Sequence, residues 1–194
     1  VAEFFRLGAQ ESSLVNYDRY GHPSVRELEE RLRMIMGITI PEIGCLAASS
    51  GMAAYNLIET WLLRERLKPG ARVAMAPYIY FEVSEQLASL PSIELHKIES
   101  YDASDIAKQV IRGGYDALFV DPLANTVEAR AIDIPTLLGL LRSAATRPIT
   151  VIIDGTMLPA ALPPHLFRER AATTQDIVVM YYESASKYLQ FGVE

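Results

Sequence analysis

Ile149-Thr150-Val151-Ile152-Ile153 is followed directly by Asp154-Gly155-Thr156. The apolar run has the length and the β-branched content of a buried strand, and it ends in a carboxylate. Near the C-terminal end stands Ser184-Ala185-Ser186-Lys187-Tyr188, in which a lysine is flanked by hydroxyl groups. Taken singly, an aspartate at a strand end is more often a cap, and a Ser-x-Ser-Lys string more often a solvated loop. Their order along the chain makes the combination informative.

The two segments supply the groups that pyridoxal phosphate (PLP) requires of a protein. A lysine amine forms a Schiff base with the cofactor aldehyde. A carboxylate such as Asp154 keeps a proton on the pyridine nitrogen, so that the ring acts as an electron sink. The hydroxyls of Ser184 and Ser186 can bind the cofactor phosphate. The sequence therefore predicts a PLP site built on Asp154 and Lys187.

Composition places the chain among globular proteins with one large domain. It has 194 residues, 50% of them hydrophobic and 22% charged, and a net charge of −6. The acidic balance and the lack of a Lys/Arg run argue against a nucleic-acid partner. The single cysteine, Cys45, fits a reducing compartment, so we predict a cytoplasmic protein. No apolar stretch has the length of a membrane span, and the histidines are too scattered for a metal site.

Short apolar runs alternate with helical patterns along the chain. The strand-like runs lie at residues 44–48, 72–76, 93–97, 117–120, 149–153 and 177–181. Helices are expected over residues 50–66, 81–89, 104–112 and 135–145, and an earlier one after a capping-box pattern at Ser24 and Glu27, with an apolar stripe at Val25, Leu28, Leu32 and Ile35. This alternation predicts an α/β fold with a mostly parallel central sheet and helices on both faces.

Polar and aromatic residues recur where the predicted strands end. Ligands of such sheets bind outside the carboxyl ends of the strands. Ser50-Gly51-Met52 opens a helix and offers free backbone N–H groups to a phosphate. Tyr80 could stack on a planar cofactor, and Asn125 could donate to a phenolate oxygen. Each has an ordinary alternative: a helix N-cap, a packing tyrosine and a turn asparagine.

With these residues in this order, the chain resembles the large PLP-binding domain of the Cys/Met-metabolism (transsulfuration) enzymes. These are the cystathionine γ-synthase and γ-lyase family of the aspartate aminotransferase fold (fold type I). The resemblance covers about residues 15 to 190. The matching segments are Tyr17-Asp18-Arg19-Tyr20-Gly21-His22-Pro23, Ser50-Gly51-Met52-Ala53-Ala54, Tyr80, Asp121 to Asn125, Asp154-Gly155-Thr156 and Ser184-Ala185-Ser186-Lys187-Tyr188.

The resemblance implies roles for individual residues. It places Lys187 and Tyr80 in catalysis, and it gives the cofactor-binding set as Lys187, Asp154, Ser50, Gly51, Met52, Tyr80, Asn125, Thr156, Ser184, Ser186, Tyr17 and Arg19. Residues 1–22 would form an N-terminal arm whose Tyr17 and Arg19 reach the neighbouring subunit, and residues 23–194 the PLP-binding large domain. A homodimer or homotetramer that shares its cofactor sites across the interface is implied. The small domain with the arginine that binds the substrate carboxylate would lie beyond residue 194.

Several positions depart from the family pattern. Phe81-Glu82-Val83 follows Tyr80 where two glycines and a threonine are usual. Asp121 replaces a glutamate, Gly155 an asparagine, and Glu183 an aromatic or small residue. They indicate a divergent substrate or reaction, in keeping with specialised metabolism.

Three functions are compatible with these residues. The first is a PLP enzyme that eliminates or replaces a group at the β or γ carbon of an amino acid. The second is an aminotransferase-type PLP enzyme, because the aspartate and lysine anchors are shared across the fold. The third is a non-catalytic or split PLP-binding fragment.

Overall fold

The computed structural model describes residues 22–38, 43–158 and 177–187. Within them five strands form one sheet in the order β2-β1-β3-β4-β5. Their bounds are β1 (Ala71–Met75), β2 (Ile93–Lys97), β3 (Ala117–Val120), β4 (Ile149–Asp154) and β5 (Ile177–Tyr182). Every neighbouring pair is parallel, which confirms the predicted sheet.

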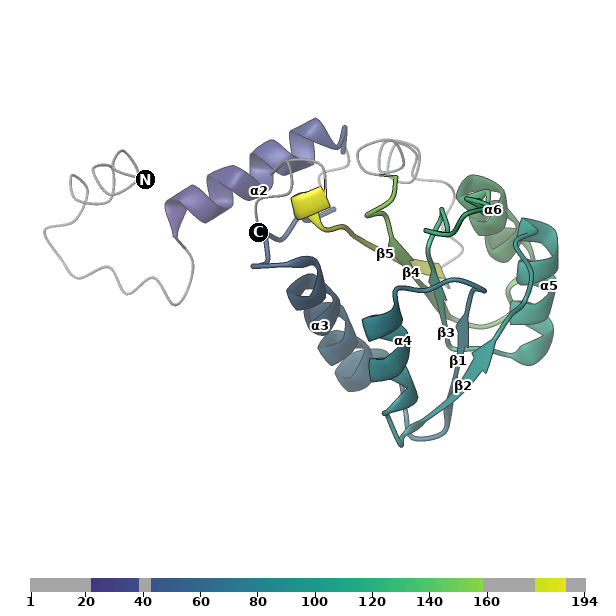
Figure 1. Ribbon diagram of the computed structural model, residues 1–194. Coiled ribbons are helices and arrows are strands. Elements are labelled where there is room, and N and C mark those ends of the chain that lie inside the picture. The colour runs from purple at the N-terminus through teal and green to yellow at the C-terminus, as the bar shows by residue number, and fades with distance from the viewer. Residues whose placement is uncertain (1–21, 39–42, 159–176, 188–194) are drawn as a thin grey trace, which may run out of the picture.

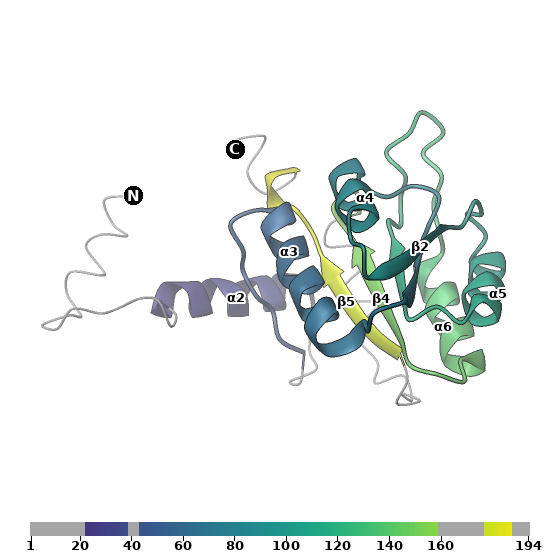
Figure 2. The same cartoon turned by 90° about the horizontal axis from the view of Figure 1, so that it is seen from below.

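Helices cover both faces of the sheet (Figures 1 and 2). The α3 (Gly51–Trp61) and α4 (Phe81–Ala88) helices lie on one face, and α5 (Ala103–Gly113) and α6 (Ile134–Ala144) lie on the other. A π-helical turn, η2 (Leu62–Arg66), continues α3, and a 3-10 turn, η3 (Ala185–Lys187), follows β5. The fold is the α/β architecture that the sequence predicts.

Alternate residues of β4 pack into two separate cores. Val151 and Ile153 face α5 and α6, whereas Ile152 faces α3 and α4. All four residues of β3 are buried. Because successive strand residues point to opposite faces, Asp154 lies on the side of Ile152, which is the α3 and α4 side.

Helix ends follow their local chemistry. The Asp102 carboxylate accepts from the backbone N–H of Asp105 at 2.8 Å and caps α5, and Asp133 accepts from Thr136 at 3.0 Å and caps α6. Gly114 ends α5 in the left-handed region, with φ of 61°. The helix expected over residues 104–112 is therefore confirmed, with one more residue at each end.

Two local predictions are wrong. Residues 44–48 form no strand, and the backbone N–H of Ala47 is instead bonded to the Glu29 carboxylate at 3.0 Å. The helix α2 (Pro23–Ile35) is capped by His22 and not by Ser24, because His22 Nδ1 accepts from the Ser24 N–H at 3.1 Å. Proline is favoured in the first helical turn, so Pro23 moves the start of the helix ahead of Ser24.

The apolar stripe of α2 is exposed in this chain. None of its residues is buried: Val25, Leu28 and Ile35 are between 41% and 64% exposed, and Leu32 is partly exposed. In Figure 1 the helix extends away from the layered domain. Glu27 and Arg31 form an ion pair at 2.5 Å on its surface. No helix in the described part of the chain is both long and apolar enough to cross a bilayer.

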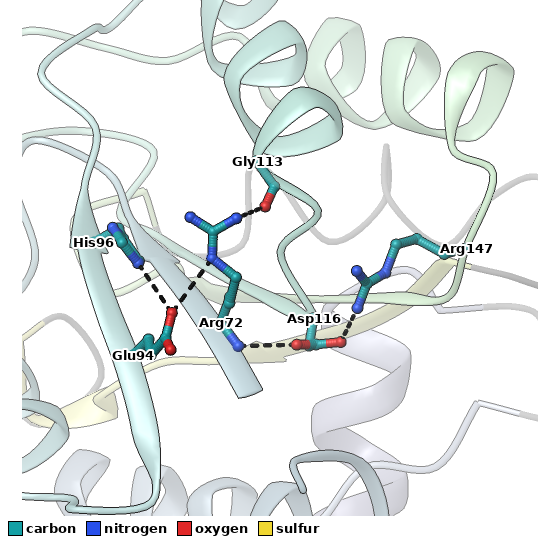
Figure 3. Close-up of polar contacts among 6 residues, drawn as sticks. All are labelled: Arg72, Glu94, His96, Gly113, Asp116 and Arg147. Carbon is teal, nitrogen blue, oxygen red and sulfur yellow. Dashed lines mark hydrogen bonds and ion pairs between the residues drawn. The ribbon is translucent and has the colours of Figure 1, made fainter. Parts of the chain in front are cut away.

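A polar network ties the amino ends of β1 and β3 together (Figure 3). The Asp116 carboxylate accepts from the backbone N–H of Arg72 at 2.9 Å and pairs with Arg147. The Arg72 guanidinium bonds the Gly113 carbonyl and lies 3.6 Å from Glu94 on β2. These contacts join the end of α5 and the segment after α6 to the sheet. They lie at the amino ends of the strands, on the opposite side of the sheet from the carboxyl ends.

Core packing predicts the stability effect of α6 substitutions. Leu137 is fully buried between α6 and the sheet, so Leu137→Ala should lower the free energy of unfolding by about 2–5 kcal/mol. Leu140→Ala on the same helix is the matched control, because Leu140 is partly exposed. Urea unfolding of the full-length protein measures both. Equal losses would contradict this packing.

Candidate active site

Three polar side chains form a row across the carboxyl edge of the sheet. Val120 pairs with Ile153 in register, so Asp121, directly after β3, and Asp154, the last residue of β4, follow this pair at adjacent strand ends. Asp154 pairs with Tyr182 of β5. Paired residues of parallel strands point to the same face, about 4.8 Å apart. Asp121, Asp154 and Tyr182 therefore stand side by side on the α3 and α4 face.

Asp121 is the most buried carboxyl group of this row, at 6% exposure. Burial, reinforced by the negative charge of Asp154, raises its pKa to about 8, against an opposing hydrogen bond from the backbone of Tyr80. Burial and the two carboxylates also raise the pKa of Tyr182 well above its ordinary value, and its hydrogen bond to Asp154 acts in the same direction. Tyr182 is therefore a neutral donor at physiological pH.

Asp154 is linked to the turn that carries the lysine. Its Oδ1 accepts from the backbone N–H of Thr156 at 3.0 Å, and Thr156 Oγ1 accepts from the backbone N–H of Ser184 at 3.0 Å. The hydroxyls of Ser184 and Ser186 are 2.8 Å apart. The ends of β4 and β5 thus form one hydrogen-bonded unit.

The N-terminus of α3 lies against this unit. Ser50 caps the helix by accepting from the Ala53 N–H at 3.0 Å. A Cβ placed on Gly51 would lie 2.9 Å from the Cβ of Ser184, so only glycine allows this approach. Met52 is partly buried and packs against the core on the α3 and α4 face of the sheet. The positive end of the α3 dipole and two serine hydroxyls consequently meet at one place.

Tyr78, Tyr80 and Asn125 lie beside the carboxylate row. Burial first, and then the charges of Asp121 and Asp154, raise the pKa of Tyr78, while a hydrogen bond with Asn125 lowers it. Tyr80 is the N-cap residue of α4 and is 37% exposed. Tyr80 and Asn125 are accordingly brought to the same strand ends as Asp154.

Lys187 ends η3 and is exposed. Its backbone N–H bonds the Ser184 carbonyl at 3.3 Å. Of the residues that the structure describes, none forms an ion pair with its ammonium group, so no direct contact joins it to Asp154. Tyr17 and Arg19 lie outside the described residues. Within the described ranges no group of three or more His, Cys, Asp or Glu residues is placed to hold a metal ion.

The sequence matches the family of Cys/Met metabolism PLP-dependent enzymes over residues 2–192, which is nearly the whole chain. The chain belongs to this family.

Curated relatives agree with this assignment. The bifunctional enzyme flvA of Aspergillus flavus is 32% identical over 98% of this chain and 23% of its own length. Methionine gamma-lyase of Arabidopsis thaliana is 26% identical over 92% of this chain and 36% of its own length. The chain thus spans well under half of the relatives that it matches.

Solved structures agree as well. A Campylobacter jejuni protein named as an O-acetylhomoserine (thiol)-lyase superposes with a TM-score of 0.61 at 25% identity, over 95% of this chain and 40% of its own. That structure holds N'-pyridoxyl-lysine-5'-monophosphate. O-acetylhomoserine sulfhydrylase of Wolinella succinogenes gives a TM-score of 0.54 at 26% identity, over 71% of this chain and 36% of its own.

The residues at the carboxyl edge fit the cofactor of this PLP-dependent family. A dianionic phosphate suits the α3 N-terminus, where Gly51 leaves space and Ser50, Ser184 and Ser186 present hydroxyls. A protonated ring nitrogen suits the carboxylate of Asp154, which its bond from Thr156 orients. The described part of the chain therefore has a matching group for each end of PLP.

Sequence reasoning missed three residues of this site. The sequence marks Asp121 as a departure from the family pattern but gives no sign that it neighbours Asp154. Tyr182 was missed because the last strand was expected to end at Tyr181, one residue too early. Tyr78 stands two positions before Tyr80 in Tyr78-Ile79-Tyr80, and this alternation after a strand was the available signal.

Two of the family departures are linked through Tyr181. A Cβ on Gly155 would lie 1.9 Å from the Tyr181 hydroxyl oxygen, so the tyrosine fills the space that an asparagine side chain would need. The same hydroxyl donates to Glu183 Oε2 at 2.5 Å. Burial, together with this bond, raises the pKa of Tyr181 far above its ordinary value. Gly155, Tyr181 and Glu183 therefore form one substituted unit beside Asp154.

The overlap predicts a thermodynamic coupling. Gly155→Ala should lower the free energy of unfolding by about 1–3 kcal/mol, because Tyr181 must move. In a Tyr181→Ala background, Gly155→Ala should leave the free energy of unfolding nearly unchanged. Gly139→Ala on α6 is the control, since a Cβ at Gly139 would meet no atom within 4 Å. This substitution should stabilise the helix by about 1 kcal/mol. Urea unfolding of all variants gives the coupling energy, and additive losses at Gly155 and Tyr181 would refute the contact.

Proposed function

We propose that the protein is a PLP-dependent enzyme that eliminates or replaces a group at the β or γ carbon of an amino acid. The supporting observation is the hydrogen-bonded unit that joins Asp154, through Thr156, to Ser184 beside the α3 N-terminus. It sets a carboxylate, a phosphate-binding helix end and the lysine-bearing turn around one strand edge.

Each residue has a distinct task in this proposal. Bound PLP supplies an electron sink for a carbanion at the substrate α carbon. Lys187 holds the cofactor before the substrate arrives, and its amine then moves protons between the α carbon and neighbouring positions. Asp154 keeps the ring nitrogen protonated. Tyr80 would cover the ring, and Asn125 would donate to its phenolate oxygen.

The class of reaction is supported by the relatives. Their names describe a methionine gamma-lyase, an O-acetylhomoserine sulfhydrylase and an O-acetylhomoserine (thiol)-lyase. All are lyase or sulfur-transfer reactions of amino acids, and none is a transamination. We therefore place elimination or replacement ahead of amino transfer, with the substituted unit at Gly155, Tyr181 and Glu183 as a basis for a divergent substrate.

We also propose an oligomer of at least two chains. Residues 1–22 would form the arm, and Tyr17 and Arg19 would bind the phosphate of the neighbouring subunit, because the fork of an arginine suits phosphate oxygens. The apolar stripe of α2 supports this, since it directly follows the arm and none of its residues is buried in the described part of the chain. Residues 23–194 would be the PLP-binding domain. The cytoplasmic location stays a prediction from the single cysteine.

The first functional prediction concerns the attachment of the cofactor. The purified full-length protein should be yellow, and borohydride reduction should fix the label on a peptide that contains Lys187. Lys187→Ala should abolish turnover even if some cofactor stays bound through its phosphate. Lys97→Ala is the matched control, because Lys97 ends β2 at the same sheet edge but pairs with Glu99 at 3.3 Å, and it should remain active. Label on Lys97 would overturn the assignment of Lys187.

The second concerns the shared site. Arg19→Ala chains and Lys187→Ala chains should each be inactive, and mixing them should restore activity, because a mixed dimer contains one intact site. Mixing Asp154→Ala with Lys187→Ala is the control. Both of these residues come from the same chain, so no intact site forms and no activity should return. If subunit exchange is verified by mass spectrometry and the first mixture stays inactive, Arg19 does not act across the interface.

A further inference from the structure

We propose that Asp121 is a positioning residue that holds the proton of the Asp121–Asp154 pair, keeps Asp154 ionised for the ring nitrogen, and releases that proton to solvent when the ring nitrogen binds. This inference rests on the proposed PLP site. It assigns a task to a residue at which the chain departs from the family pattern.

The geometry makes the two carboxyl groups interdependent. Asp121 and Asp154 follow the register pair of Val120 and Ile153, so their side chains leave the sheet on one face at adjacent strand ends. Two neighbouring carboxylates, of which one is buried, cannot both be charged without a large electrostatic cost, so one of them keeps a proton.

Burial decides which of the two carries the proton. Asp121 is 6% exposed, whereas Asp154 is partly exposed and has Oδ1 bonded to the Thr156 N–H. The surrounding titratable groups are Tyr78 and Tyr80 after β1 and Tyr182 on β5, and the raised pKa values of Tyr78 and Tyr182 keep those phenols neutral. The pKa of Asp121, raised to about 8 by burial and then by Asp154, agrees with a neutral Asp121 at pH 7.

A cation bound beside Asp154 favours the ionised form of Asp121. A pyridinium N–H beside Asp154 offsets the negative charge that acts on Asp121, so the proton affinity of Asp121 falls. The proton then leaves Asp121 for the solvent. The affinity for the pyridine ring should consequently increase as the pH rises towards 8. In this range Asp121 is protonated in the free protein and ionised in the complex.

Infrared spectroscopy of the ligand-free, full-length protein tests where the proton resides. At pH 7 the carbonyl stretch of a protonated carboxyl group should be present, should be absent from Asp121→Asn, and should disappear as the pH passes about 8. Asp154→Asn should shift the midpoint of that loss to lower pH, because the like charge is gone. Asp116→Asn is the matched control, since Asp116 stands at the other end of β3 and pairs with Arg147, and it should leave the band unchanged.

Calorimetry tests the release. The probe is 4-deoxypyridoxine 5'-phosphate, which lacks the aldehyde and therefore forms no bond to Lys187. Titration in buffers of different ionisation enthalpy should show that the wild-type protein releases more protons than Asp121→Asn, by up to one proton per site, with the largest difference just below pH 8. The substitution keeps an acceptor for the Tyr80 N–H, so we expect the variant to fold.

The outcomes separate this inference from the proposed function. Any of three results would overturn the role of Asp121. The carboxyl band could persist in Asp121→Asn, or its pH midpoint could be unchanged in Asp154→Asn. The wild-type protein and Asp121→Asn could also release equal numbers of protons. Failure of the probe to bind the wild-type protein would instead refute the PLP site, whatever the infrared band shows.

Discussion

Backbone hydrogen bonds between β3, β4 and β5 set Val120 opposite Ile153 and Asp154 opposite Tyr182. A shift of one residue in either pairing would turn the side chains of that strand to the other face. The two hydrophobic cores prevent such a shift, because Val151 is buried on one face of the sheet and Ile152 on the other. The alignment of Asp121, Asp154 and Tyr182 is thus a consequence of hydrophobic packing, and the site inherits its geometry from the sheet.

Much of this fold could be predicted from the sequence because its signals are local. The bounds of β2 and β3 agree with the predicted runs, since β3 is a short apolar segment and β2 alternates apolar Ile93 and Leu95 with polar residues. The strand predicted at residues 44–48 fails because Glu29, eighteen positions away, takes the N–H of Ala47. No local pattern contains that contact.

The site shows the same division. Asp154, Lys187 and the helix opening at Ser50 could be found because their residue types and order are distinctive. The partnership of Asp121 with Asp154 depends on strand register, and the contact of Gly155 with Tyr181 depends on a turn packing over a strand. Both become visible only when the chain is folded. The residues that make this family member different are therefore the ones that sequence reasoning placed least well.

The parallel topology also has a consequence for how the site comes into being. Each parallel pairing requires a long crossover, so contacts between β3, β4 and β5 join segments that are distant in the chain. Loop closure must precede such contacts, which makes them slow to form. The helices α5 and α6 can form from local interactions, but the carboxylate row exists only once β5 has docked on β4. During synthesis, cofactor capture would accordingly be a late event that reports completed folding of the sheet.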